Sequence, residues 1–317
     1  MTFLELAAGY PLEKILGITY KDKNGKILRN APRPLIPDLD SLPFPERGLL
    51  DMHAYTRKVY GQKATSLITS RGCPYNCSFC CKDTFGSRVR YRSVDSVLSE
   101  VKSNIDTYGI RHFLFYDDTF TLKRKRLHLL CKEFEKLNII FRCNGNARYN
   151  TYEDYQALYD GGCREIAFGI ETGSQKILNL INKGTTLKQN KDAIKNAQKA
   201  KLIVKAYLMI GNPGESRETV EETKKFIAEA DPDQFTLFTF VPLPGCDIWK
   251  NPGKYGIKII DRNFEQYFNI AGQNEGGLVI ETETLKPADI KELREELLDF
   301  LRSRGQRGKL QDYYKTI

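Results

Sequence analysis

The chain has 317 residues, of which 41% are hydrophobic and 28% charged, the proportions of an ordinary globular protein. Its apolar runs are only a few residues long, far short of the roughly 20 that a membrane-spanning helix needs, so we expect no membrane span. The N-terminus lacks a basic segment followed by an apolar stretch, so no secretory signal is indicated and we expect a cytoplasmic protein.

The formal net charge is +9, which raises the question of nucleic-acid binding. A basic stretch occurs at residues 301–315, but elsewhere lysines alternate with acids, as in residues 291–300. An interface with nucleic acid requires clustered positive charge, so the pattern argues against that partner.

Residues 1–60 differ from the rest of the chain and are predicted to form an extended strap or connector. Five prolines fall within residues 30–50, and proline fixes the backbone in an extended conformation. A flexible linker is the alternative, but apolar residues such as Leu39, Leu42 and Phe44 favour an ordered segment packed on a surface.

From residue 61 to 245, short apolar segments alternate with segments of helical period. The predicted strands are 65–70, 112–116, 138–142, 165–170, 203–210 and 235–241. Ser93 is predicted to cap one helix, and Thr219 with Glu222 is predicted to form a capping box before another. This alternation predicts an α/β fold, a partial (β/α)6 TIM-like barrel with parallel strands.

Residues 246–317 are predicted to be a C-terminal extension that covers the barrel. Its clearest element is a helix with Pro287 near the start, an apolar stripe through Leu293 and Leu297, and Gly305 at the end. We expect this helix to pack against the main domain, and we expect residues 242–270 to contribute to the pocket.

Three cysteines directly follow the first predicted strand: Cys73, Cys77 and Cys80. Clustered cysteines in a reducing compartment are more often metal ligands than disulfides. Three thiolates would leave one iron of a cubane without a protein ligand. A structural zinc site needs four closed ligands, and a redox dithiol of Cys77 and Cys80 would leave Cys73 unexplained, so an iron–sulfur site is favoured over both. Cys81 is interpreted as a bystander, because adjacent side chains rarely face one metal.

Further motifs come at the ends of later predicted strands. Asp117 and Asp118 follow the second strand, residues 169–174 (GIETGS) follow the fourth, and residues 210–215 (IGNPGE) follow the fifth. In parallel barrels the carboxyl ends of the strands carry the active site, so these motifs are expected to meet there.

Together these motifs resemble the signature of the radical S-adenosylmethionine (SAM) superfamily. The resemblance implies that Cys73, Cys77 and Cys80 bind a 4Fe–4S cluster and that its open iron binds SAM, whose reductive cleavage yields a 5′-deoxyadenosyl radical. It further implies that several residues bind SAM. These are Phe79 near the adenine, Asp117 and Asp118 at the amino group, Glu171 at the ribose, and Gly211, Pro213 and Glu215 in a turn that approaches the adenine. The two aspartates depart from the usual Gly-Gly-Glu motif, and Asp118 could instead cap the next helix.

Residues 16–51, together with the segments 113–121, 169–175 and 209–215, resemble the cobalamin-dependent branch of this superfamily. That resemblance implies a small-molecule substrate, an electron donor such as ferredoxin or flavodoxin, and methyl transfer to carbon or oxidative cyclisation. A cobalamin-binding domain is not recognised in these residues, so cobalamin is expected only through a missing or separate domain or protein.

Two other functions are kept as alternatives. The chain could be a catalytically degenerate iron–sulfur module for binding or assembly. It could also resemble a methylthiotransferase acting on transfer RNA, although the additional cysteines and the RNA-binding domain of that class are not recognised here.

Overall fold

The computed structural model describes residues 1–52, 54, 58–59, 61–267 and 278–304. The chain divides into two compact units, Met1–Asp38 and Leu39–Ile317. The first unit holds helix α1 (Thr2–Ala7) and an antiparallel hairpin of β1 (Thr19–Lys21) and β2 (Ile27–Arg29).

The second unit is built on one large sheet. In the described part of the chain this sheet has seven strands in the order β11-β10-β9-β8-β7-β4-β3. All neighbours are parallel except the edge pair of β3 and β4. The strands are β3 (Lys58–Val59), β4 (Gln62–Leu67), β7 (His112–Phe115), β8 (Ile140–Gly145), β9 (Cys163–Glu171), β10 (Ile203–Ile210) and β11 (Gln234–Thr239).

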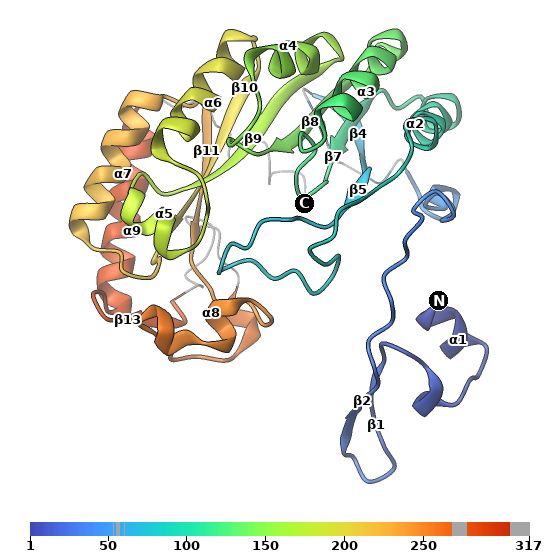
Figure 1. The fold of residues 1–317 in the computed structure, drawn as a ribbon, viewed down its shortest axis with the longest axis horizontal. Helices are drawn as coiled ribbons and strands as arrows, with labels where there is room; N and C mark the ends of the chain where they lie inside the picture. Colours follow the sequence, from blue (N-terminus) through green and yellow to red (C-terminus); the bar gives the residue numbers. More distant parts are fainter. Residues whose placement is uncertain (53, 55–57, 60, 268–277, 305–317) are drawn as a thin grey trace. The chain divides into compact units, whose positions relative to one another are not determined.

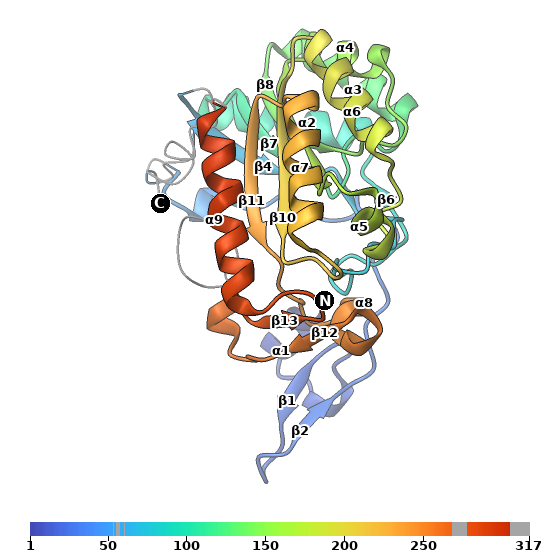
Figure 2. The same ribbon diagram turned by 90° about the vertical axis from the view of Figure 1, so that its left-hand side faces the viewer.

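Helices between the strands cover the outer, convex face of this curved sheet, as Figures 1 and 2 show. They are α2 (Val94–Tyr108), α3 (Arg124–Leu137), α4 (Tyr152–Asp160), α6 (Leu187–Lys199) and α7 (Arg217–Ala230). The short helix α5 (Gln175–Leu180) lies at the carboxyl end of the strands. The core lies between the sheet and the helices, where the Phe115 ring contacts the buried rings of Phe120, Phe134 and Phe141. The predicted partial barrel with parallel strands is confirmed.

Some boundaries differ from those predicted. The first barrel strand ends at Leu67, and Ser70–Arg71 (β5) instead pairs with Arg90–Tyr91 (β6). The third begins at Ile140, because Asn138 adopts a left-handed conformation (φ 50°) that ends α3.

The helix caps confirm one prediction and correct another. The Ser93 hydroxyl accepts a hydrogen bond from the Ser96 amide at 3.0 Å, as expected of a cap. The capping box at Thr219 and Glu222 is wrong, because α7 begins one turn earlier. Ser216 is its N-cap and Thr219 its partner, with 2.9 Å between the Ser216 amide and the Thr219 hydroxyl.

After β11 the chain forms shorter elements and one long helix. The short elements are α8 (Asp247–Lys250), the 3₁₀ turns η3 (Pro252–Tyr255) and η4 (Phe264–Tyr267), and the antiparallel pair of β12 (Ile257–Ile259) and β13 (Ile280–Thr282). Helix α9 (Pro287–Ser303) packs against α7, β10 and β11, which confirms the predicted packing. Gly305, predicted to end this helix, and most of the basic stretch lie outside the described residues. Within the described part, no helix has the length and apolarity to cross a membrane.

Residues 39–50, a part of the predicted strap, lie on α2 and the adjoining strand. The Asp40 carboxylate accepts a hydrogen bond from the Ser93 amide at 3.0 Å. Arg47, in the short 3₁₀ turn η2 (Arg47–Leu49), forms an ion pair with Glu100 of α2 at 2.9 Å and donates to the carbonyl of Ser66 at 2.8 Å. These contacts hold this segment in one ordered position.

Candidate active site

The three cysteines lie on the loop that joins β5 to β6. Its first turn requires glycine, since Gly72 has φ +100° and a Cβ there would lie 2.6 Å from the carbonyl oxygen of Arg88. The middle of the loop is fixed through Ser78, whose amide donates to the Ile181 carbonyl at 2.9 Å and whose carbonyl accepts from the Ile248 amide at 3.1 Å. Two distant segments therefore anchor the cysteine loop.

The thiols of this loop are close enough to affect one another. Partial burial raises the pKa of Cys77, whereas the nearby Lys183 ammonium lowers it. Partial burial, followed by the charges of Cys77, Cys73 and Asp118, raises the pKa of Cys80 to about 11. Cys80 and Asp118, predicted to belong to one site, are thus brought together.

Glu171 and Lys183 form an ion pair beside the cysteines. Lys183 Nζ lies 2.5 Å from Glu171 Oε1, and both side chains are largely buried. Despite the burial penalty, the charges of Glu171 and Cys77 raise the pKa of Lys183. The ammonium also lies 5.7 Å from the ring centroid of Phe79, so it connects two of the predicted cofactor-binding residues.

The backbone at Glu171 is strained to present this side chain. Glu171 closes β9 in a left-handed conformation with φ +66°, which is rare outside glycine. Gly173 then permits close approach of α7, because a Cβ there would lie 2.5 Å from Thr223 Cα. Such strain is frequent at functional sites, where surrounding contacts stabilise it.

Asp117 and Asp118 have different surroundings. Asp117 is buried, and its carboxylate accepts hydrogen bonds from the Thr69 amide and hydroxyl (both 2.6 Å) and from the Ser70 hydroxyl (2.7 Å). Burial raises the pKa of Asp117, partly offset by those bonds and by the Arg126 charge. Asp118 is exposed, and the next helix, α3, has Lys123 at its N-cap, so Asp118 does not cap it.

The turn after β10 is closed by Glu215. Its carboxylate accepts from the Gly211 amide at 2.5 Å and the Asn212 amide at 3.1 Å, while Gly211 takes φ +86°. Burial raises the pKa of Glu215 to about 7. The turn, which includes Pro213, packs on α5, since a Cβ at Gly214 would lie 2.7 Å from Leu180 Cδ1. Helix α5 leads directly into Ile181, an anchor of the cysteine loop.

The donor chemistry of the loop fits an iron–sulfur cluster. The three cysteines are free thiols that alternate with residues holding the loop in place. Within the described ranges, no group of three or more His, Cys, Asp or Glu side chains converges on one metal position. A cubane does not require such convergence, because each cysteine binds a different iron.

One residue of this region, Lys183, carried no signal in the sequence. Lys183 lies 12 residues after Glu171 in a loop, and no spacing rule connects the two. Arg148 lies with its guanidinium 5.0 Å from the Tyr75 ring centroid and donates to the Gly184 carbonyl, so it joins the β8 loop to the cysteine loop. Arg142, on β8, pairs with Glu165 on the neighbouring strand at 3.3 Å.

Several known proteins are similar in sequence to this chain. The chain is 40% identical over 259 residues to the uncharacterized methyltransferase PH0819 of Pyrococcus horikoshii, covering 79% of this chain and 55% of that protein. It is 28% identical over 255 residues to the anaerobic magnesium-protoporphyrin IX monomethyl ester cyclase of Rubrivivax gelatinosus, covering 79% and 45%. The chain thus spans about half the length of these relatives.

Among solved structures, the fold is similar to the radical SAM methyltransferase TsrM of Kitasatospora setae, with a TM-score of 0.62 at 17% identity, covering 92% of this chain and 57% of that one. It is also similar to the cobalamin-dependent SAM radical enzyme OxsB, with a TM-score of 0.61 at 18% identity, covering 96% and 43%. A model of the radical SAM superfamily matches residues 67–227, which span β4 to α7 and contain the cysteine loop. That match covers just over half of the chain, and membership implies a 4Fe–4S cluster and SAM as cofactors. The chain therefore belongs to the radical SAM superfamily.

Proposed function

We propose that this protein reductively cleaves SAM at a 4Fe–4S cluster and uses the radical to modify a small organic substrate. The observation that carries the proposal is the anchored cysteine loop, which contains Cys73 and holds Cys77 and Cys80 next to the Glu171–Lys183 pair. When bound, the cluster and SAM supply the electron transfer and carbon–sulfur cleavage that generate a 5′-deoxyadenosyl radical. The chain's own residues bind and orient these cofactors.

The surroundings of each side chain support specific roles. Asp118 is exposed and close to Cys80, so we assign it to the amino group of SAM, whereas Asp117 positions the loop through Thr69 and Ser70. Glu171, oriented by Lys183, is assigned to the ribose hydroxyls.

The remaining assignments concern the adenine. The half-buried Phe79 would contact it through its backbone. Gly211 and Pro213 would present the turn to the ring, and Glu215 would hold that turn from behind through the Gly211 and Asn212 amides.

Methyl transfer to carbon is the reaction we place first, and oxidative cyclisation second. A methyltransferase and a cyclase are both among the relatives, and TsrM is a methyltransferase. TsrM and OxsB have both been solved with cobalamin bound, which supports a role for cobalamin here. We propose that a further domain or a separate cobalamin-binding protein supplies it, and that ferredoxin or flavodoxin supplies the electron.

The test is anaerobic reconstitution of the cluster, followed by addition of SAM and dithionite. We expect 5′-deoxyadenosine to form, and S-adenosylhomocysteine to accompany it when cobalamin and substrate support methyl transfer. Full cluster loading without either product would contradict the proposal.

Equilibrium binding of SAM distinguishes the degenerate iron–sulfur module. Such a module would bind no SAM after reconstitution, whereas the proposed enzyme binds it with or without turnover.

A further inference from the structure

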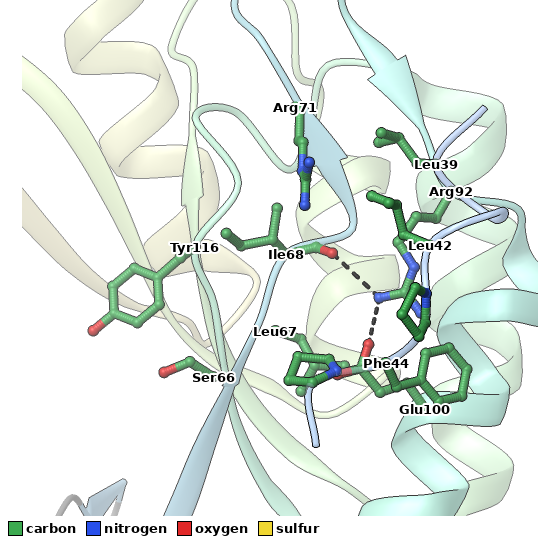
Figure 3. A pocket seen from close by; sticks show the side chains of 12 residues that line it. Leu39, Leu42, Phe44, Ser66, Leu67, Ile68, Arg71, Arg92, Glu100 and Tyr116 are labelled. Atoms are coloured by element: carbon green, nitrogen blue, oxygen red, sulfur yellow. Dashed lines mark hydrogen bonds and ion pairs between the residues drawn. The ribbon is translucent and has the colours of Figure 1, made fainter. Parts of the chain in front are cut away.

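A cavity of about 250 Å³ lies between residues 39–50 (the strap) and the ends of β4 and β7 (Figure 3). Apolar side chains form most of its wall: Leu39, Leu42, Pro43, Phe44, Pro45, Leu67 and Ile68. Ser66, Tyr116, Glu100 and two arginines complete it. At about 30 Å³ per water molecule the space equals roughly eight waters, enough for one arm of an organic molecule.

One of these arginines, Arg92, is part of the wall. It pairs with Glu100, donates to the Ile68 carbonyl at 3.3 Å and donates to the Ser96 carbonyl at 3.0 Å. Glu100 is only 2% exposed and also pairs with Arg47 of the strap. These contacts fix the strap against α2 and satisfy the Arg92 charge within the protein.

The other arginine, Arg71, is arranged differently. Figure 3 shows its guanidinium directed toward Ile68, and Leu39, Leu42 and Phe44 of the strap line the same cavity. Its guanidinium carbon lies 5.4 Å from the centroid of the Phe85 ring, and within the described residues no carboxylate pairs with it. A guanidinium without an anionic partner, facing an apolar cavity, attracts an oxyanion, because its planar set of donors matches a carboxylate.

We propose that this cavity binds a substrate arm that consists of an apolar stem ending in a carboxylate, with Arg71 as the carboxylate-binding residue. The inference rests on the proposed function and names its substrate class. Arg71 is separated from Cys73 only by Gly72, so an arm anchored there places the rest of the substrate next to the cysteine loop. The apolar wall would contact the stem of the arm, and the Arg71 guanidinium would bind its carboxylate.

The experiment uses the reconstituted full chain and two probes, 4-phenylbutyrate and its uncharged amide. Binding is measured by titration calorimetry for the wild type, Arg71→Gln, Arg71→Lys and Arg88→Gln. Arg88 is an exposed arginine of the same loop that does not line the cavity, so it is the matched control. Iron content is measured for every variant.

We expect the wild type and Arg88→Gln to bind the acid about tenfold more tightly than the amide. Arg71→Gln should lose that preference, and Arg71→Lys should recover part of it. Leu42→Trp, which fills the cavity and leaves Arg71 in place, should weaken binding of both probes. Equal binding of acid and amide by the wild type, no binding of either, or an unchanged preference in Arg71→Gln would overturn the inference.

Cleavage of SAM is followed in the same samples. Absence of SAM cleavage by the wild type would contradict the proposed function. Intact cleavage, with no effect of the Arg71→Gln substitution on probe binding, would contradict only the cavity assignment. Should Arg71→Gln fail to load its cluster, the acid–amide comparison on the wild type and the Leu42→Trp variant still decides the question.

Discussion

Lys183 and Glu171 form an ion pair, 2.5 Å between Nζ and Oε1, directly beside the cysteine loop. Glu171 closes β9, and Lys183 lies in the loop that follows α5. The pair unites a cation that lowers the pKa of Cys77 with a carboxylate that we assign to SAM. Through this pair, charges at the end of β9 and in the loop after α5 act on the Cys77 thiol.

Replacing Lys183 with Met should weaken SAM binding about tenfold and lower the free energy of unfolding by about 2 kcal/mol. Glu171 would remain largely buried without its cation, and the thiolate of Cys77 would lose a stabilising charge. Calorimetric titration with SAM and urea unfolding measure the two effects. Lys183→Arg should restore most of both.

Lys188 provides the control for this pair. It also forms a 2.5 Å ion pair, with Asp192, but its side chain is 84% exposed. Lys188→Met should change stability by less than about 0.5 kcal/mol and leave SAM binding unaltered. Equal effects of the two substitutions would show that burial beside the cysteines is irrelevant.

Asparagine substitutions of the adjacent Asp117 and Asp118 should have opposite effects, the first on stability and the second on SAM binding. Asp117→Asn should cost about 2–3 kcal/mol of stability, because an amide group would face donors now bonded to the carboxylate. Asp118→Asn should leave stability within about 0.5 kcal/mol and weaken SAM binding about tenfold. Unfolding and SAM titration of both variants test this, and unchanged SAM affinity in Asp118→Asn would refute its assignment.

Glu215 should make stability depend on pH. Its pKa is about 7 in the folded protein against 4.5 as the ordinary value, so the folded state retains a proton that the unfolded state releases. Its contribution is therefore complete below pH 4.5 and is lost as the pH rises through 7, by roughly 3 kcal/mol.

Glu215→Gln mimics the protonated form and should remove this dependence. Urea unfolding between about pH 4.5 and 8 should show the wild type losing stability relative to the variant. Glu218→Gln, at an exposed position in the first turn of α7, is the control and should follow the wild type. Parallel curves for wild type and Glu215→Gln would contradict the burial argument.

Serine substitutions of the adjacent Cys80 and Cys81 should distinguish a cysteine that binds the cluster from one that only packs. Cys80→Ser should abolish stoichiometric iron and sulfide after reconstitution, because one thiolate ligand is lost. Cys81→Ser should retain both, since Cys81 lies against the 245–246 segment, where a Cβ at Gly245 would be 2.9 Å from its sulfur. Loss of iron in both variants would mean that Cys81 is also required.

The sequence alone determined the elements whose causes are local. The alternation of apolar strands and amphipathic helices predicted the parallel sheet, and the spacing of Cys73, Cys77 and Cys80 predicted the cluster site. Such patterns are readable because strand period, helix period and motif spacing depend on neighbours in the chain. The capping box at Thr219 failed for a related reason: Ser216 and Thr219 have the same spacing as Thr219 and Glu222, and local pattern could not choose between them.

Only the tertiary structure decided which contacts each side chain of the candidate site makes. Asp117 is bonded to Thr69 and Ser70, 48 and 47 residues away, and that contact distinguishes it from Asp118. Lys183 beside Cys77, and Arg71 in one cavity with residues of the strap, are likewise juxtapositions of segments far apart in sequence. Charge, burial and hydrogen bonding act through space, so they become defined only when the sheet brings the strand ends together.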